Sequence, residues 1–531
     1  MAALNGGRRH DRLSAGLALI AGAAAGFAHP PWGFLPGLLG YGLMAWAVDR
    51  ASPGRPVRSA FWRGWLAGCG YFAVSLHWIV YPFFVDAQNQ AWMAPFALGF
   101  MVAGMAVFWG AAMAVYRACA ASGVQRVLLF AGALAGFEWL RGHILTGFPW
   151  DLPGETWAAG SSPSQLASVV GAYGLTWITL AIFATAAVAI GEGRRGRIAV
   201  ALGLAGVVAL TAYGEVRLGH PPMTDPHALW VRVVQPNLPQ LAQYDQASFD
   251  HILNKYVSMT SWPAGHRPDI VVWPEGAVPA ALEDYLAPGT WTGLKIGETL
   301  NANTTLLIGG YRFADGSAPH PTAFNSLVAV RRASGGVGVI GLYDKFRLVP
   351  FGEYIPLDSL AGRLGIKEMV HVGDGFTSGP RPRPMPLLGL PPAQPLICYE
   401  VLFPGFTHEG AAASGLRPMW IVNVSTDAWF GAGAGPLQHF NLARYRAIEE
   451  GLPMVRATPT GVSGVIDAFG RVALGMSLGE GATGVIDAPL PPALPPTLFS
   501  QWGDAGFWLM MLVSLIGIRP FWRREKTGAA A

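Results

Sequence analysis

The sequence contains a series of apolar stretches, several of which have about the 20 residues needed to cross the hydrocarbon core of a bilayer. Apolar residues make up 52% of the sequence and charged residues only 13%, against a typical charged share of about 25%. Eight candidate spans can be marked: 13–28, 35–49, 60–82, 91–116, 124–141, 164–191, 197–214 and 504–522. We therefore predict a polytopic α-helical membrane domain with about eight spans.

A cleaved signal peptide is the alternative for the first stretch. The basic start, the apolar core of 13–28 and the small residues before His29 fit one. Further apolar segments follow at once, and they favour a membrane span. The sequence has three cysteines, which show no metal-ligand or disulfide spacing. Two of them, Cys69 and Cys119, lie in or beside apolar stretches, so we expect them to be small core residues.

Arginine and lysine residues alternate between the loops. They precede the first span, lie in or flank the loops between spans two and three, four and five, and six and seven, and lie at the end of the last span or after it: Arg8, Arg9, Arg12, Arg50, Arg55, Arg58, Arg117, Arg126, Arg194, Arg195, Arg197, Arg519, Arg523, Arg524 and Lys526. The other loops, such as 29–33 and 85–90, have almost none. Because basic loops stay on the cytoplasmic side, both termini are predicted to be cytoplasmic and the residues after about 215 periplasmic in a bacterium.

The residues from 227 to 487 have a different pattern. Short runs rich in Val, Ile, Leu and aromatic residues predict buried strands: 229–237, 269–275, 304–311, 325–332, 337–345, 395–400 and 419–425. The segment 436–451 reads as a helix, with a proline in its first turn and a glycine at its end. Strands that alternate with helices predict an α/β domain of layered sheets.

These patterns predict three parts. Residues 1–226 form the membrane domain with spans one to seven, 227–487 form the catalytic domain, and 488–531 hold a proline-rich linker, the last span and a cytoplasmic tail. The net charge of +4 is small and gathers in short loops, so no nucleic-acid partner is expected.

Three chemically active side chains end apolar runs in the catalytic part. Glu275 closes IVVWPE, Lys345 closes GLYDK and Cys398 follows PLI. A thiol attacks as thiolate, and because its free pKa is about 8.5 it needs a base to take its proton. Glu275 is the candidate base, and Lys345 is a candidate for stabilising the oxyanion that forms when a carbonyl is attacked. The fold would have to bring the three together, because no local spacing joins them.

Each of these residues also has an ordinary structural interpretation. A cysteine at the end of an apolar strand is more often a core residue than a nucleophile, a glutamate after a strand usually faces solvent, and Lys345 after Asp344 fits an edge charge. The flanking sequences are what strengthen the catalytic interpretation.

With those flanks the chain resembles a known family. WPEGAVP (273–279), DKFRLVPFGEYIP (344–356) and CYE (398–400) resemble the three catalytic segments of the nitrilase superfamily. Within it, RLVPFGEY (347–354) and EWLRGHILTGFPW (138–150) are similar to the apolipoprotein N-acyltransferase family, as is a soluble domain between spans seven and eight. The resemblance covers nearly the whole chain.

The resemblance implies a fold and a set of roles. The catalytic domain would be a nitrilase-like αββα sandwich, with Glu275 as general base, Lys345 as stabiliser of the tetrahedral intermediate and Cys398 as nucleophile. Glu353 matches a supporting glutamate of the family. Tyr399 and Glu400 match residues that the family needs after its nucleophile.

Two aromatic positions carry weaker implications. The family typically has a Trp a few residues after its VQ-N-PQ segment, and here Tyr244 stands in that place, which leaves its role open. Trp150 is a candidate lid or lipid contact, with an interfacial-belt residue as the alternative.

The implied reaction is transfer of an acyl chain from a phospholipid, through a cysteine thioester, to the α-amine of an N-terminal diacylglyceryl-cysteine of an apolipoprotein. It is the last step of lipoprotein maturation in the bacterial inner membrane, it uses no cofactor or metal, and a monomer suffices. Spans 60–82 and 124–141 are a candidate entrance, and Glu138 and Arg141 mark either a substrate path or interfacial anchoring. GAGAGP (431–436) is a candidate lid, or a simple glycine-rich turn.

Two other functions compete with this one. A membrane-tethered amidase or nitrilase acting on a small soluble amide would use the same three residues but would not need eight spans. A transporter with an accessory domain would need paired charges deep in several spans, and the sequence has few.

Overall fold

The computed structural model describes residues 2–52, 54–120, 123–189, 193–220, 225, 227–241, 244–314, 322–355, 375–516 and 519–520, with side chains from Leu13 onward. The chain divides into two compact units. Unit 1 comprises Met1–Pro221, Gly433–Tyr445 and Thr497–Ala531, and unit 2 comprises Pro222–Ala432 and Arg446–Pro496. The basic residues predicted for the two cytoplasmic ends (Arg8, Arg9, Arg12, Arg519, Arg523, Arg524 and Lys526) lie outside the described side chains.

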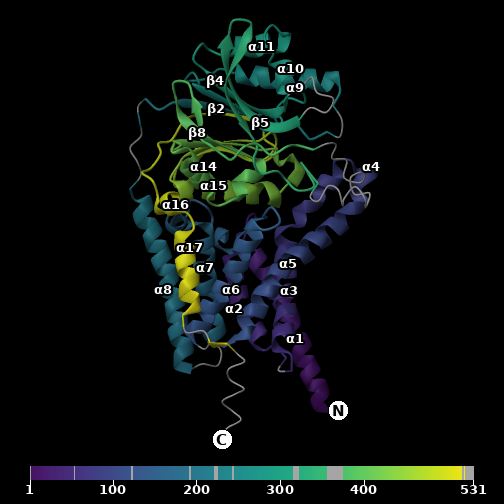
Figure 1. Cartoon of the computed structure of the whole chain (residues 1–531), viewed down its shortest axis with the longest axis vertical. Coiled ribbons are helices and arrows are strands. Elements are labelled where there is room, and N and C mark those ends of the chain that lie inside the picture. The colour runs from purple at the N-terminus through teal and green to yellow at the C-terminus, as the bar shows by residue number, and fades with distance from the viewer. Residues whose placement is uncertain are drawn as a thin grey trace. The chain divides into compact units, whose positions relative to one another are not determined.

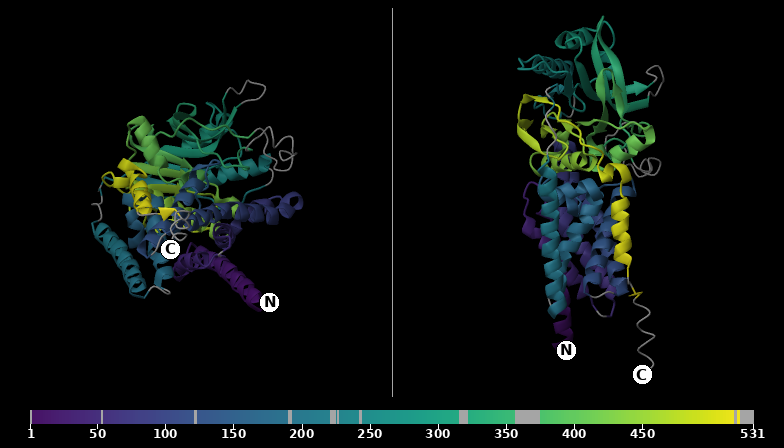
Figure 2. Two further views of the ribbon diagram at one scale, coloured as in Figure 1. Left: turned by 60° about the horizontal axis from the view of Figure 1, so that its bottom comes forward. Right: turned by 90° about the vertical axis from the view of Figure 1, so that its left-hand side faces the viewer.

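Unit 1 is helical, and its long helices run roughly parallel to one another as a bundle (Figures 1 and 2). Its longer elements are α1 (Ala2–Gly26), α2 (Leu39–Asp49), α3 (Pro56–Ser75), η2 (His77–Phe84), α5 (Ala94–Ala118), α6 (Val124–His143), α7 (Ala167–Ala189), α8 (Gly193–Leu218) and α17 (Ala505–Leu515). Between them lie η1 (Leu35–Leu38), α4 (Ala87–Gln90), η3 (Ala91–Met93), η4 (Pro153–Thr156), η5 (Ser162–Leu166) and α16 (Leu498–Trp502). The two-residue strands β1 (Cys119–Ala120) and β14 (Arg519–Pro520) pair antiparallel.

Small residues let the helices of unit 1 approach closely. A Cβ added to Gly22 of α1 would lie 1.8 Å from the carbonyl oxygen of Ala67 in α3, and one added to Gly70 of α3 would lie 2.1 Å from the carbonyl oxygen of Leu19. Such backbone-to-backbone packing is typical of helices in membranes, where van der Waals contact replaces the hydrophobic driving force.

Three helical stretches are long and apolar enough to cross a bilayer: Ala87–Ala118, Ser162–Ala189 and Gly193–Leu218. The pair α3 and η2, bent by 49°, gives a fourth if it is one broken span. Two shorter apolar helices, Leu13–Gly26 and Ala505–Leu515, coincide with the first and last predicted spans, and α2 and α6 coincide with the second and fifth. Because length and composition support three or four spans among the described residues, the eight-span layout remains a prediction.

The expectation that Cys69 and Cys119 are core residues is wrong. Both side chains are only partly buried, whereas Cys398 is buried. Cys119 follows the last residue of α5, where the chain leaves the helix in an extended conformation, and a helix end has fewer neighbours than its middle.

Unit 2 contains two six-stranded mixed sheets. The first has the order β13-β2-β3-β4-β5-β6, and its strands β2, β3 and β4 are parallel. The second has the order β12-β11-β10-β9-β8-β7, and its strands β8, β9 and β10 are parallel. The strands are β2 (Trp230–Gln235), β3 (Ile270–Trp273), β4 (Thr305–Ala314), β5 (Thr322–Ala333), β6 (Gly336–Asp344), β7 (Met385–Leu387), β8 (Leu390–Ile397), β9 (Trp420–Val424), β10 (Met454–Ala457), β11 (Ser463–Ile466), β12 (Val472–Leu478) and β13 (Gly484–Pro489).

The apolar faces of the sheets explain the layers. Along β3, Ile270 and Val272 belong to a core that also includes Val422 and Val455 of the second sheet, while Val271 and Trp273 pack on the other face with α9. This two-residue alternation is what a strand buried on both faces requires. Figure 1 shows α9 (Gln246–Thr260), α10 (Leu282–Tyr285) and α11 (Trp291–Thr299) on one side of the strands and α14 (Phe406–Ser414) on the other. The predicted layered α/β domain is confirmed.

The helix predicted over 436–451 is α15 (Ala434–Glu450). Gly451 follows it with φ 65°, a left-handed conformation that favours glycine and ends the helix. Residues 434–445 of this helix belong to unit 1 and residues 446–450 to unit 2. The predicted boundaries at 226 and 487 stay predictions.

Candidate active site

The base candidate and the nucleophile candidate both follow parallel strands of unit 2. Glu275 comes two residues after β3, and Cys398 comes directly after β8. Carboxyl ends of parallel strands are where α/β folds place binding groups. The backbone at Glu275 also lies close to the neighbouring strand, since a Cβ added to Gly309 of β4 would lie 2.6 Å from the Cα of Glu275. A side chain at Gly309 would therefore displace Glu275.

Lys345 is placed by the antiparallel ladder between β5 and β6. Its backbone N–H donates to the carbonyl oxygen of Asn325 at 2.8 Å, one step beyond the pair Ser326–Asp344. Its Nζ lies 2.9 Å from the Glu353 carboxylate and 3.4 Å from Oε1 of Glu275. The structure therefore brings the predicted amine and the predicted base together.

This ammonium is buried, with 1% of its side chain exposed. Burial alone would lower the pKa of Lys345, but the carboxylates of Glu353 and Glu275 more than offset it and hold the pKa above its ordinary value. Lys345 is therefore a fixed positive charge at neutral pH, as stabilisation of an oxyanion requires.

Cys398 has a strained backbone conformation. Its φ is 47°, a left-handed value that costs energy in a residue with a Cβ, and its side chain is buried. Burial and the negative charge of Glu275 raise the pKa of the thiol to about 12, although Lys345 and a hydrogen bond with Ser425 act to lower it. The thiol is thus protonated at neutral pH, and it needs a base at the moment of attack.

The second oxygen of Glu275 is also held. Its Oε2 accepts from the backbone N–H of Thr426 at 2.8 Å, and the Thr426 hydroxyl donates to the Glu275 carbonyl oxygen at 2.9 Å. Thr426 follows β9, the strand next to β8. Each end of the carboxylate is therefore oriented by a different part of the domain.

Glu353 belongs to the turn after Val349. Its Oε2 accepts from the Val349 backbone N–H at 2.8 Å, while its carbonyl oxygen accepts from Phe376 at 2.7 Å. Glu353 therefore contacts the Lys345 ammonium together with Glu275.

Glu400 joins the nucleophile turn to the segment that carries Lys345. Its Oε2 accepts from the Ile397 backbone N–H at 2.8 Å, and its Oε1 accepts from the Tyr343 hydroxyl and the Phe346 backbone N–H, each at 2.8 Å. Burial raises the pKa of Glu400 to about 7, against the opposing effect of these hydrogen bonds. Tyr399 is buried beside it and packs edge-to-face on Phe403.

Two parts of the site were not predicted from the sequence. Asn325 donates to both Glu275 and Glu353. Beside Cys398, the Ser425 hydroxyl donates to Asp427 at 2.8 Å, and Asp427 pairs with the fully buried Arg456 at 2.8 Å. The sequence signal for Ser425 and Asp427 was only their position at the end of the run 419–425 and just after it, and Arg456 had none.

The structure does not bring Tyr244 into this cluster among the described contacts. Its side chain is 39% exposed, and its hydroxyl accepts from the Leu241 backbone N–H at 3.3 Å. Its predicted role in place of the family Trp stays a prediction.

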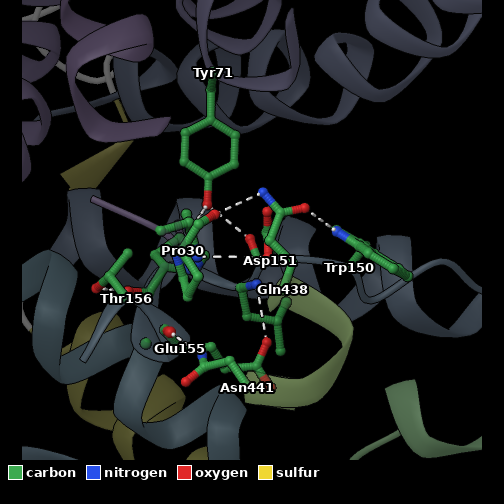
Figure 3. Close-up of polar contacts among 12 residues, drawn as sticks. Pro30, Tyr71, Trp150, Asp151, Glu155, Thr156, Gln438 and Asn441 are labelled. Carbon is green, nitrogen blue, oxygen red and sulfur yellow. Dashed lines mark hydrogen bonds and ion pairs between the residues drawn. The ribbon is translucent and has the colours of Figure 1, made fainter. Parts of the chain in front are cut away.

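Trp150 lies in the interior of unit 1 (Figure 3). It is 2% exposed, packs against Trp78 and donates from its indole Nε1 to Oε1 of Gln438 at 2.9 Å. The same oxygen accepts from Trp78 at 3.0 Å, and the Gln438 amide donates to the Pro30 carbonyl oxygen at 3.1 Å. In this conformation Trp150 therefore has no surface available to lipid.

The predicted pair of ionisable residues in α6 is also interior. Glu138 and Arg141 are 0% and 1% exposed and form an ion pair with each other. Arg141 donates to the carbonyl oxygens of Phe148 at 2.5 Å and Trp150 at 3.0 Å, and Trp109 donates to Glu138 at 2.5 Å. The pair holds the chain between residues 148 and 150, and the described structure leaves neither group open to a substrate or at an interface.

Among the described residues, no group of three or more His, Cys, Asp or Glu side chains could hold a metal ion. The chemistry of the cluster is that of a thiol, a base and a fixed cation.

Comparison with known proteins finds related families and relatives over most of the chain. Residues 21–185 match the apolipoprotein N-acyltransferase N-terminal domain, and residues 231–494 match the carbon-nitrogen hydrolase family. An apolipoprotein N-acyltransferase of Caulobacter vibrioides is 52% identical over 94% of this chain and 93% of its own length. Those of Rhodopseudomonas palustris and Bradyrhizobium diazoefficiens are 36% and 37% identical over 97% and 95% of this chain and 96% and 94% of their own lengths.

Proposed function

This chain belongs to the apolipoprotein N-acyltransferase family, and we propose that it transfers an acyl chain from a phospholipid, through a thioester on Cys398, to the α-amine of the N-terminal diacylglyceryl-cysteine of an apolipoprotein. The observation that carries this proposal is the contact of Lys345 with both Glu275 and Glu353. In the same domain, the charges of Glu275 and Lys345 shift the pKa of the buried Cys398 thiol. A thiol, a base and a cation are the parts that acyl transfer through a thioester needs.

In the first half-reaction Glu275 takes the thiol proton while the sulfur of Cys398 attacks the ester carbonyl of the phospholipid. The oxygen that becomes negative is stabilised by the ammonium of Lys345. When the tetrahedral intermediate collapses, the ester C–O bond breaks and the proton passes from Glu275 to the leaving oxygen. The products are the Cys398 thioester and a lysophospholipid.

In the second half-reaction the α-amine of the acceptor attacks the thioester carbonyl. Glu275 takes a proton from the amine, Lys345 stabilises the second oxyanion, and the C–S bond breaks. The sulfur recovers its proton from Glu275, and the acceptor leaves with an amide bond. The site then has its starting protonation.

The remaining predicted residues support this site. We assign Glu353 to holding Lys345, and Glu400 to fixing the turn of Cys398 relative to Lys345. Tyr399 belongs to the same turn as Cys398 and packs edge-to-face on Phe403. Trp150 and Tyr244 are assigned to substrate contact only through the resemblance, and Trp150 would have to leave its buried position to meet lipid.

The membrane arrangement is part of the proposal. Both substrates are lipids held in a bilayer, so a membrane domain of about eight spans with both termini cytoplasmic would place the catalytic domain in the periplasm of a bacterial inner membrane. The long apolar helices and the arginines of alternate loops, such as Arg50, Arg55 and Arg117, support this orientation. A monomer without cofactor suffices.

The experiment is incubation of the purified enzyme with phospholipid labelled in its acyl chains and a synthetic diacylglyceryl-cysteine peptide. We expect labelled N-acyl peptide and stoichiometric lysophospholipid, with neither product from the Cys398→Ala variant. Hydrolysis of small soluble amides without any acyl transfer to the peptide would instead support the amidase alternative.

A further inference from the structure

The side-chain amide of Asn325 bridges the two carboxylates of the site. Its Nδ2 donates to Oε1 of Glu275 at 2.8 Å and to Oε1 of Glu353 at 2.7 Å. These are the two glutamates that the Lys345 ammonium contacts. Asn325 is 7% exposed, so water does not readily replace it as a donor.

Charge explains why a donor is needed there. Glu275 and Glu353 can carry two negative charges, whereas Lys345 supplies one positive charge. Two carboxylates that share one buried cation disfavour each other's ionisation, and N–H groups that donate to them favour it. The amide of Asn325 supplies one N–H to each carboxylate without adding charge of its own.

The backbone fixes where this amide lies. Asn325 pairs with Tyr311 of β4, and its carbonyl oxygen accepts from the Lys345 backbone N–H at 2.8 Å. The same residue therefore sets the start of the Lys345 side chain through its backbone and the orientation of both glutamates through its side chain. A substitution at 325 changes only the second of these.

We propose that Asn325 is a positioning residue that keeps Glu275 ionised and aimed for proton transfer. The proposal rests on the proposed function, in which Glu275 is the general base for Cys398. It makes Asn325 a determinant of the pH range in which the thiol can be acylated, acting through Glu275 and without contact to the substrate.

Two nearly isosteric variants separate the charge of the side chain from its shape. Asn325→Asp removes both N–H donors and adds a third carboxylate. We therefore expect the acid limb of the pH–rate profile, where the acylation rate falls as the pH is lowered, to move to higher pH by about one unit or more. One unit lowers the rate at a given pH on that limb about tenfold. Asn325→Leu removes the donors without adding charge, and we expect a smaller move in the same direction.

The readout is the burst of nitrophenol released when p-nitrophenyl butyrate acylates the enzyme, measured between pH 5 and 8. This ester needs neither phospholipid nor lipoprotein, so the result does not depend on the natural substrates. If phospholipid fails to acylate the enzyme but the burst shows the displaced limb, the proposed function fails and the role of Asn325 stands.

The matched control is Asn303→Asp, which places the same new charge on an exposed turn of the same unit and should leave the profile unchanged. The proposal is supported if the acid limb lies at the highest pH in Asn325→Asp, at a lower pH in Asn325→Leu and at the lowest pH in the wild type. A fall that is uniform across the pH range, or no change, would overturn it, because a purely structural role does not displace the limb. If the Asp variant does not fold, the Leu variant decides by the same criterion.

Discussion

Both units bury a glutamate beside a cation, but they use the pair differently. In unit 1, Glu138 and Arg141 are matched one to one, and the remaining guanidinium donors go to the carbonyl oxygens of Phe148 and Trp150. In unit 2, one ammonium, Lys345, serves two carboxylates.

The difference distinguishes an ion pair that stabilises the fold from one that belongs to the proposed active site. The unit 1 pair is charge-balanced and its groups are bonded to protein, so it stabilises one conformation of the chain after α6. The unit 2 cluster has an excess of carboxylate, and in the proposed function it acts on a protonated thiol whose backbone is strained. Residue types alone do not distinguish the two, whereas the balance of charge and the neighbouring nucleophile do.

The largest effect on the unit 2 side should come from Glu275→Gln. We expect acyl transfer at pH 7 to fall by about 10²- to 10⁴-fold, the usual contribution of a general base. Alkylation of Cys398 by iodoacetamide at pH 9 should become faster, because the negative charge of Glu275 raises the thiol pKa and the variant removes it.

Opposite changes in these two rates distinguish loss of a base from general damage. Glu283→Gln, on the exposed side of the same unit, is the control and should change neither rate. A parallel fall in both rates of the Glu275 variant would argue that the residue is structural, as Glu138 is.

The second test compares the two cations. Lys345→Met should lower acyl transfer by about 10²- to 10³-fold, since an oxyanion loses its fixed positive partner. Arg141→Met should instead lower the stability, by about 3–5 kcal/mol, because Glu138 is left buried without a counter-charge. The measurements are single-turnover acyl transfer and thermal unfolding for each variant.

A second substitution that removes the charge of the neighbouring glutamate distinguishes the two clusters further. Glu138→Gln should recover much of the stability lost in Arg141→Met, because it removes the unpaired charge. Glu353→Gln should not recover the acyl transfer lost in Lys345→Met. Equal recovery in both double variants would remove the distinction between the two clusters.

A smaller effect is expected for Glu400→Gln. One buried N–H donor would face an amide group in place of an oxygen, at a cost of about 1–3 kcal/mol in the free energy of unfolding. Since Glu400 links the turn of Cys398 to Phe346, the acyl-transfer rate should fall as well. Asp467→Asn, at a partly exposed turn of the same unit, should cost less, and a Glu400 variant as stable and active as wild type would remove its assigned role.

The smallest effect is expected in unit 1 for Trp150→Phe. The variant loses one hydrogen bond to Gln438, which costs about 0.5–1.5 kcal/mol, and keeps most of the aromatic packing. If Trp150 only packs, the KM for phospholipid should not change. A raised KM with unchanged stability would show that Trp150 leaves its buried position to contact lipid.

The parts of the molecule that sequence reasoning found are those with a local signal. Glu275, Lys345 and Cys398 each end an apolar run, and all seven predicted strands are present. The five strands of unit 2 that were missed are only three to seven residues long. In β12 the apolar residues do not all correspond to burial, because Leu474 is fully exposed.

The parts that were missed depend on register. Asn325 lies 50 residues from Glu275 and 28 from Glu353 along the chain, and only the ladder β4-β5-β6 brings its amide to both. The sequence also placed Glu138 and Arg141 near a helix end without showing whether they face inward. Burial of a charge depends on which neighbours cover it, and that is decided by packing between distant helices.

In the proposed reaction Cys398 carries the acyl chain, and mass spectrometry of the purified enzyme after exposure to phospholipid without any acceptor tests this step. We expect an acyl mass in thioester linkage on the peptide that contains Cys398, released by hydroxylamine and absent from the Cys398→Ala variant. An enzyme that transfers acyl chains while this peptide stays unmodified, or a Cys398→Ala variant that still transfers them, would show that Cys398 does not carry the acyl chain.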